Sequence, residues 1–236
     1  EMVLEGGRVT GVVVESGGSM ETIPAAAVVI SDGGFQANMD LMRRYVSPAP
    51  EKLLQRGAAT GHGDGMTMAE AAGAKLVGMD RFYGHLLGRD AFEVEKLWPY
   101  PIVDPIAAHS IVVDEAGQRF LDEGMGGVYM ANEVAKLDDP LTATVVFDDA
   151  VWNGLAADNR YPPCMNPVFV NAGGTVLEAP DLATLAQKAG VSADGLSATV
   201  AAYNGAIESG ATQTPVRTVS KFTPQTIATP PFRAIP

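Results

Sequence analysis

The sequence predicts an α/β protein, and three features carry this prediction. The run A-A-A-V-V-I over residues 25–30 is continuously apolar and is followed by Gly33-Gly34, as at the end of a buried parallel strand. A glycine-rich stretch, residues 57–65, leads into a helical pattern. Residues 182–189 and 196–207 carry helical periodicity.

The first 80 residues are expected to form a hairpin and two helices. Residues 8–30 read as two strands joined by the Gly17-Gly18 turn, the second strand running into the apolar stretch. A short helix over 39–45 is ended by Pro48 and Pro50. A second helix over 66–72 has Asp64 as its N-cap and Gly73 as its stop.

The character of the sequence changes near Tyr83. Strands are predicted over 111–113, paired with Arg119-Phe120 as a hairpin, and over 144–147. Asp181 is expected to cap the helix over 182–189, which Gly190 ends. The following helix places Leu196, Val200, Tyr203 and Ile207 on one buried face. Residues 210–236 are rich in Thr and Pro and are expected to be extended and loop-like.

The glycines suggest a ligand. Glycines directly after a strand let the backbone approach a cofactor closely, and a glycine-rich loop entering a helix presents free N–H groups and a positive dipole end. A plain tight turn and a capped loop without a ligand are the alternatives for these two features.

Composition narrows the class of protein. The chain has 236 residues, of which 47% are hydrophobic, so it can fill a core. A net charge of -12 without a basic stripe argues against nucleic acid as a partner. A membrane span, a signal peptide and a metal-ligand cluster are not apparent, and Cys164 is the single cysteine. We therefore expect a cytoplasmic protein.

The order of motifs resembles one family. V-V-I-S-D-G-G-F-Q-A-N is followed by A-T-G-H-G-D-G-M-T-M-A-E-A-A-G-A, by His85 and by I-V-V-D-E-A-G-Q-R-F-L-D-E. This order is similar to that of the fumarate reductase/succinate dehydrogenase flavoprotein superfamily, which includes soluble fumarate reductases and 3-ketosteroid dehydrogenases. The later segments P-D-L-A-T-L-A-Q-K-A-G and P-P-F-R-A-I extend the resemblance over most of the chain.

The resemblance implies FAD as cofactor and a particular domain organisation. Residues 1–80 are expected to be the tail of a Rossmann-like FAD-binding domain, and residues 81–236 a fumarate reductase-type capping domain of the α+β type. Since a G-x-G-x-x-G fingerprint is missing, we interpret the chain as an internal fragment whose partner is the remainder of the FAD domain. Alone it is expected to bind FAD weakly or not at all. The implied FAD contacts are Ser31, Asp32, Gly33, Gly34, Thr60, Gly61, Asp64 and Gly65.

His85 falls where fumarate-reducing members carry a histidine for the substrate carboxylate. A histidine there can donate to a carbonyl and help polarise the double bond. The family's His-Pro-Thr is here His85-Leu86-Leu87, so a purely structural histidine remains an alternative. The family's acid arginine and its relay fall at Gly127, Val103 and Ile106, so the parent protein is expected to be a poor fumarate reductase. Arg119 and Glu123 are expected to form a salt bridge that holds the hairpin.

The segment from Leu97 to Val103 is apolar and aromatic, and it suggests a pocket for an apolar substrate such as a steroid-like enone. The candidate catalytic residues are His85, Tyr100 and Tyr129, with Tyr83 as a further possible proton donor or base. The expected function is reduction or dehydrogenation of a carbon–carbon bond next to a carbonyl of a small molecule. A non-catalytic binding module that keeps the cap fold without flavin is the alternative.

Overall fold

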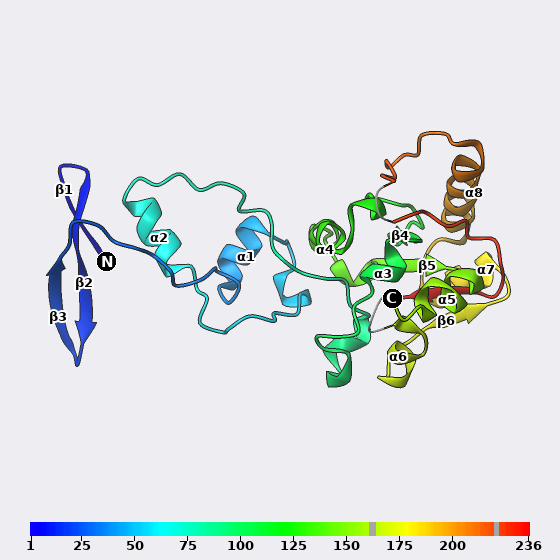
Figure 1. Cartoon of the computed structure of the whole chain (residues 1–236), viewed down its shortest axis with the longest axis horizontal. Coiled ribbons are helices and arrows are strands. Elements are labelled where there is room, and N and C mark those ends of the chain that lie inside the picture. Colours follow the sequence, from blue (N-terminus) through cyan, green and yellow to red (C-terminus); the bar gives the residue numbers. More distant parts are fainter. Residues whose placement is uncertain (161–163, 220–221) are drawn as a thin grey trace. The chain divides into compact units, whose positions relative to one another are not determined.

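The structure is a computed structural model that describes residues 1–160, 164–219 and 222–236, and it divides into two compact units (Figure 1). The first unit comprises Glu1–Glu51 and Gln55–Arg81. The second comprises Lys52–Leu54 and Phe82–Pro236. Helices and sheets are mixed along the chain, which agrees with the predicted α/β class at this coarse level.

The first unit begins with a three-stranded antiparallel sheet in the order β1-β2-β3. Its strands are β1 (Met2–Glu5), β2 (Arg8–Ser16) and β3 (Ser19–Pro24). Gly17 and Gly18 turn the second hairpin with φ of 58° and 81°, a backbone conformation that glycine adopts without steric cost. The predicted hairpin is confirmed, but its second strand ends at Pro24.

The prediction of a buried parallel strand over residues 25–30 is wrong. Val29 is 89% exposed, and residues 26–33 make no backbone–backbone hydrogen bond within the described part of the chain. A parallel strand is stable only when neighbouring strands and covering layers take up its backbone groups and apolar side chains. All strand pairs in the described residues are antiparallel, and none involves this segment.

Two helices follow in the first unit. α1 (Met39–Tyr45) has the predicted bounds, and the side chain of Asn38 accepts hydrogen bonds from the first turn. α2 (Asp64–Ala71) begins earlier than predicted, so Asp64 is its first residue and not its N-cap. The N-cap is Gly63, with φ of 78° and no capping side chain of its own. Gly73 follows α2 with φ of 92°, as expected of a helix stop.

The second unit is built on a four-stranded antiparallel sheet in the order β4-β5-β7-β6. The strands are β4 (Ile111–Val113), β5 (Thr144–Phe147), β6 (Leu177–Ala179) and β7 (Phe232–Ile235). β4 and β5 confirm the predicted strands, whereas Arg119 reaches Val113 only through an isolated bridge. The expectation of a loop-like C-terminal segment is wrong at its end, where β7 pairs with β5 and β6. Four residues are too few to show a strand pattern in the sequence.

Helices cover both faces of this sheet. The α-helices of the second unit are α3 (Asp104–Ala107), α4 (Gly127–Ala135), α5 (Asp149–Asn153), α6 (Met165–Asn171), α7 (Leu182–Ala189) and α8 (Ala193–Ser209). Short 3₁₀ helices lie at Pro50–Lys52, Arg89–Phe92, Glu95–Leu97, Glu123–Met125, Pro140–Thr142 and Leu155–Ala157. Asp181 caps α7 by accepting from the Thr184 N–H at 2.7 Å, and Gly190 ends it, as predicted.

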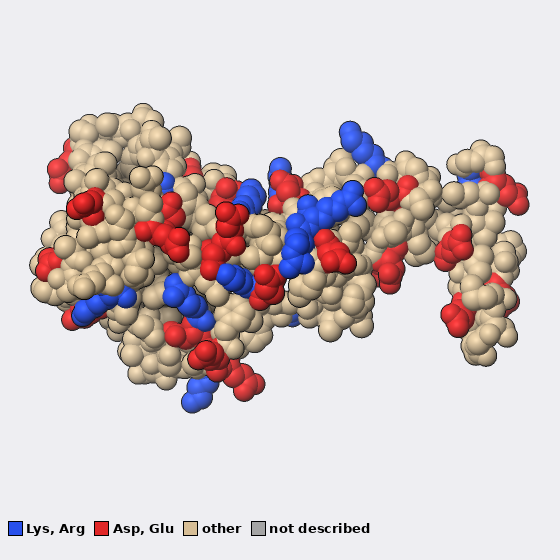
Figure 2. Space-filling model, turned by 180° about the vertical axis from the view of Figure 1, so that it is seen from behind, with Lys and Arg blue, Asp and Glu red and all other residues tan. Residues whose placement is uncertain are grey.

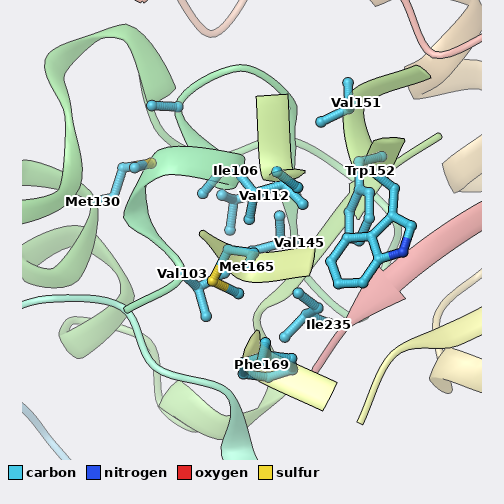
Figure 3. Close-up of a cluster of buried hydrophobic side chains, with 14 of the residues drawn as sticks. Val103, Ile106, Val112, Met130, Val145, Val151, Trp152, Met165, Phe169 and Ile235 are labelled. Atoms are coloured by element: carbon cyan, nitrogen blue, oxygen red, sulfur yellow. The ribbon is translucent and has the colours of Figure 1, made fainter. Parts of the chain in front are cut away.

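Two clusters of buried side chains form the core, one on each face of the sheet. Alternate residues of the strands point to opposite faces, so Val112 and Val145 belong to one cluster while Ile111 and Val146 belong to the other. Figure 3 shows the first cluster, in which side chains from α3 to α6 meet the sheet. The second cluster includes Leu196, Val200 and Tyr203 from α8, with Ile207 partly buried against it, which confirms the predicted helical face.

Candidate functional site

The two glycine stretches of the first unit lie against each other. Asp32 Oδ2 accepts a hydrogen bond from the Gly65 N–H at 2.6 Å, and the Gly63 N–H donates to the Gly34 carbonyl at 3.2 Å. Asp32 therefore takes the capping role at α2 that the sequence assigned to Asp64. An acidic side chain at a helix N-terminus satisfies a free N–H and interacts favourably with the dipole.

The implied FAD contacts of the first unit differ in solvent exposure. Ser31, Asp32, Gly33, Gly34, Thr60 and Asp64 are exposed, whereas Gly61 and Gly65 are buried. Gly33 has φ of 93°, and a Cβ there would meet nothing within 4 Å. By contrast, a Cβ on Gly61 would lie 2.5 Å from the Gln36 amide nitrogen, and one on Gly65 would lie 2.2 Å from the Asp32 carboxylate. Protein side chains thus occupy the space beside the two buried glycines.

His85 is the centre of a polar group in the second unit. Its Nδ1 lies 2.6 Å from Asp104 Oδ2, and its Nε2 lies 3.2 Å from the Tyr83 hydroxyl. The rings of Tyr83 and His85 meet edge to face, with centroids 5.1 Å apart. Asp104 is the first residue of α3, 19 positions after His85. The structure therefore joins a predicted residue, His85, to an aspartate that the sequence prediction missed.

The segment that carries Tyr83 and His85 is fixed at both ends. Asn132, on α4, accepts from the Phe82 N–H at 2.9 Å and donates to the Phe82 carbonyl at 2.8 Å. At the other end the Leu86 N–H donates to Asp104 Oδ1 at 2.8 Å. Between them, Gly84 packs against the Phe82 ring, which a Cβ would meet at 2.4 Å. These contacts hold the histidine in place before any ligand binds.

Burial gives the Asp104 carboxyl unusual proton affinity. Loss of solvation raises its pKa above the ordinary value of 3.8, and the hydrogen bonds from His85 and Leu86 offset this only in part. The side chains of His85 and Asp104 are 17% and 13% exposed, so water competes weakly for their hydrogen bond. A carboxylate–imidazole pair of this kind can orient a histidine and stabilise a proton on it.

The other candidate tyrosines are placed differently. Tyr100 is 45% exposed, and Tyr129 is half-buried on α4. Burial, together with the nearby Glu133 charge, raises the pKa of Tyr129 above its ordinary value. The side-chain hydrogen bonds of His85 go to Asp104 and Tyr83, so the structure does not bring Tyr100 or Tyr129 into this group.

The apolar segment near Trp98 divides between core and surface. Leu97 and Val103 are 1% exposed and belong to the core, whereas Trp98 and Ile102 are half-buried. Leu86 and Leu87, which follow His85 in the sequence, line an apolar pocket whose walls are mainly aliphatic, with the exposed Arg89 among them. It is lined in part by Leu86, Leu87, Val103, Val112, Leu141 and Val145.

The structure also describes the three positions at which fumarate reductases carry their acid arginine and its relay. Val103 and Ile106 are core residues, each 1% exposed. Gly127 faces the Asp104 carboxylate. Arg119 Nε lies 2.8 Å from Glu123 Oε1 in a buried salt bridge, which confirms the predicted pairing. Glu123 also accepts from the Val112 N–H at 3.1 Å, and Arg217 lies beside it, so this group ties the turn after β4 to the later chain.

The first unit thus has an exposed glycine-rich edge and the second a fixed histidine–carboxylate pair, which are compatible with the class of cofactor-dependent oxidoreductases. Residues 1–235 match the FAD binding domain family. The chain belongs to this family, as the resemblance to the fumarate reductase/succinate dehydrogenase flavoproteins implied.

Known proteins agree with this assignment. The chain is 28% identical to 3-oxosteroid 1-dehydrogenase of Mycobacterium tuberculosis, over 89% of this chain and 39% of that protein. It is 31% identical to 4-oxocyclohexanecarboxylate 2-dehydrogenase of Sinomonas cyclohexanicum, over 85% of this chain and 34% of that protein. The chain thus spans less than half the length of these relatives.

A solved structure shows the same fold. This structure is the 3-ketosteroid delta1-dehydrogenase of Sterolibacterium denitrificans in complex with 1,4-androstadiene-3,17-dione. The match covers 99% of the present chain and 46% of the chain in that structure. The TM-score is 0.68 and the sequence identity is 21%.

FAD is the cofactor that the family implies, and the glycine-rich residues of the first unit fit it in part. The exposed hydroxyls of Ser31 and Thr60 and the open backbone at Gly33 suit contact with a polar edge of FAD. The N-terminus of α2 does not suit its pyrophosphate, because the Asp32 carboxylate already takes the Gly65 N–H. These residues thus fit one edge of FAD but not its pyrophosphate.

The described residues contain neither a membrane-spanning type of helix nor a group of side chains arranged to hold a metal ion. Acidic side chains are scattered over the face seen in Figure 2 and alternate with basic ones. On this face the acidic side chains do not form one block.

Proposed function

We propose that the chain is part of an FAD-dependent oxidoreductase that reduces or dehydrogenates a carbon–carbon bond next to a carbonyl, on an apolar substrate such as a steroid-like enone. The observation that carries the proposal is the 2.6 Å contact between His85 and Asp104, in a chain of the FAD binding domain family. Residues 1–80 then correspond to the tail of the FAD-binding domain and residues 81–236 to the capping domain.

The names of the relatives support the reaction class. Both 3-oxosteroid 1-dehydrogenase and 4-oxocyclohexanecarboxylate 2-dehydrogenase describe dehydrogenation of a cyclic ketone. In such a reaction FAD supplies the hydride chemistry, and the protein has to bind the carbonyl and move a proton. His85 has the chemistry to take part in moving this proton, because an imidazole nitrogen accepts or donates a proton according to its protonation state.

The substrate is proposed to be apolar because of the residues that follow the histidine in the sequence. Leu86 and Leu87 line a pocket whose walls are mainly aliphatic, and Trp98 is a half-buried aromatic residue of the same unit. Gly127, Val103 and Ile106 provide no cation for a second carboxylate where fumarate reductases carry their acid and relay. Apolar surface buried on binding contributes about 25 cal/mol per Å², so a ring-sized ketone gains more here than a small diacid.

The test is a binding and turnover panel on the full-length flavoprotein. Steroid-like enones are compared with fumarate and succinate by flavin quenching, and turnover is measured for each compound. The enones should bind more tightly and turn over faster than the diacids. His85→Ala should weaken the binding of all the enones, whereas Trp98→Ala should weaken the binding only of those with large rings. Tighter binding of the diacids, or unchanged affinity in both variants, contradicts the proposal. A parent protein purified without flavin favours the alternative of a non-catalytic binding module.

A further inference from the structure

We propose that Asp104 is a positioning residue that fixes His85 with its proton on Nδ1, so that Nε2 accepts the Tyr83 hydroxyl proton and Tyr83 exchanges a proton with the substrate. This inference rests on the proposed function, since it assigns the proton-transferring group of the same reaction. It also selects Tyr83 among the three tyrosines that the sequence left open.

The hydrogen bonds around Asp104 determine the tautomer. Oδ1 accepts from the Leu86 N–H at 2.8 Å, and this backbone donor fixes the orientation of the carboxylate. Oδ2 then faces His85 Nδ1 at 2.6 Å. An ionised carboxylate only accepts hydrogen bonds, so Nδ1 carries the proton and Nε2 presents its lone pair. The Tyr83 hydroxyl, 3.2 Å away, is therefore the donor in the remaining hydrogen bond.

The raised pKa of Asp104 supports this arrangement. Burial increases the proton affinity of the carboxylate, so it holds the Nδ1 proton firmly and makes the imidazole a better acceptor at Nε2. When the tyrosine proton moves to Nε2, the imidazolium that forms is stabilised by the adjacent negative charge. Asp104 acts only through His85, because its Oδ1 accepts from the Leu86 N–H and its Oδ2 is bonded to His85 Nδ1.

Tyr83 combines this partner with access to a ligand. Its side chain is 76% exposed among residues of the second unit, and it stands on a segment that Asn132 and Asp104 hold at both ends. Tyr129 has the opposite properties, because burial and Glu133 raise its pKa and make its proton harder to remove. The geometry thus gives Tyr83 a proton acceptor and an open path to a ligand.

The proton balance is explicit. In the dehydrogenation direction, the carbon–hydrogen bond next to the carbonyl breaks and its proton goes to the Tyr83 oxygen, while the hydroxyl proton of Tyr83 passes to His85 Nε2. In the reduction direction both transfers reverse, and Tyr83 gives its proton to carbon. This is the proton half of the reaction, and the hydride half is the chemistry that FAD supplies.

The first test reads the tautomer directly. Nitrogen-15 chemical shifts are measured in the full-length flavoprotein labelled with ¹⁵N-histidine, and the His85→Gln variant identifies the signal. We expect the proton on Nδ1 in the wild type. Asp104→Asn should move it to Nε2, because the Leu86 N–H keeps the amide oxygen and leaves the amide nitrogen to donate to Nδ1. A proton on Nε2 in the wild type, or no change in a folded Asp104→Asn variant, overturns the inference.

The second test uses kinetics with an accepted ketone. Tyr83→Phe and Asp104→Asn should each lower kcat by about 10²-fold to 10⁴-fold with little change in KM. The kcat of the double variant should be no lower than that of the less active single variant, because the two residues act on the same proton transfer. Tyr129→Phe tests the rival assignment, and a larger loss there than in Tyr83→Phe overturns ours. If no ketone is turned over, the proposed function fails, while the tautomer result still decides the role of Asp104.

Discussion

Gly127 is the first residue of α4 and leaves room for Asp104: a Cβ on Gly127 would lie 1.7 Å from Asp104 Oδ2. Real atoms do not approach so closely, so any side chain at this position displaces the carboxylate. The resemblance to fumarate reductases assigned an acid arginine to this place. In this chain the carboxylate that holds His85 occupies the same space. An arginine at position 127 and the His85–Asp104 pair therefore exclude each other.

The first prediction follows from this contact. Gly127→Ala should lower the melting temperature and break the His85–Asp104 hydrogen bond, although alanine is the better helix former. The displaced carboxylate leaves the Leu86 N–H without its acceptor, and an unsatisfied buried donor costs about 1–3 kcal/mol. Thermal unfolding measures the loss of stability, and the nitrogen-15 signal of His85 shows whether its proton is released from Nδ1.

Gly205 provides the matched control. It lies on the exposed surface of α8, and a Cβ there would meet nothing within 4 Å. Gly205→Ala should therefore stabilise the protein, by about 0.5–1 kcal/mol, through better helix propensity. Equal effects of the two substitutions would show that the contact with Asp104 relaxes at no cost.

The second prediction concerns the pH dependence of stability. Burial raises the pKa of Asp104 above its unfolded value of 3.8, so the folded state binds this proton more tightly than the unfolded state. The contribution of Asp104 to stability is then complete below pH 3.8 and declines as pH rises through the folded pKa. Asp104→Asn removes the titration, so its melting temperature relative to wild type should rise between pH 4 and pH 7. A difference that is constant with pH, or that falls, contradicts the direction of the shift.

The third prediction concerns the buried Arg119–Glu123 pair. Glu123→Gln should destabilise the second unit by about 3–5 kcal/mol, because it leaves Arg119 and the neighbouring Arg217 without their buried counter-charge. Chemical denaturation measures this loss. Glu51→Gln breaks an exposed pair with Arg43 and should cost about 0–1 kcal/mol. A small loss at Glu123 would mean that water reaches the arginines when the charge is removed.

Local signals explain how much of the fold could be predicted. α1 and α7 have caps and stops within a few residues of their ends, and the sequence placed both at their observed bounds. β7 has only four residues after Pro230-Pro231, too few to show a strand pattern in the sequence, and it is a strand because β5 and β6 lie on either side. The apolar run over 25–30 shows the converse, since a strand-like sequence stays extended and exposed without a partner.

In the candidate site, too, local signals identify single residues, whereas their contacts become visible only in the structure. His85 was found by its place in the order of motifs, whereas Asp104 had only the weak signal of an aspartate before Pro105 at a helix start. Their pairing depends on the chain path between them. Asp32 was selected as a cofactor contact, and its hydrogen bond to Gly65 became visible only when the two glycine stretches were seen together.

The last prediction is that the isolated chain binds FAD weakly or not at all. Within the first unit, the Gln36 amide fills the space beside Gly61 and the Asp32 carboxylate covers the start of α2, so the two buried glycines are closed to the cofactor and only the exposed edge around Gly33 remains for it. The chain should elute from gel filtration colourless after incubation with excess FAD, while the full-length protein passed through the same column should stay yellow. Asp32→Ala frees the Gly65 N–H and removes a negative charge, so any residual FAD affinity should increase in that variant. Stoichiometric flavin absorbance in the wild-type chain would show that residues 1–236 suffice for the cofactor, and that Asp32 and Gln36 give way when FAD enters.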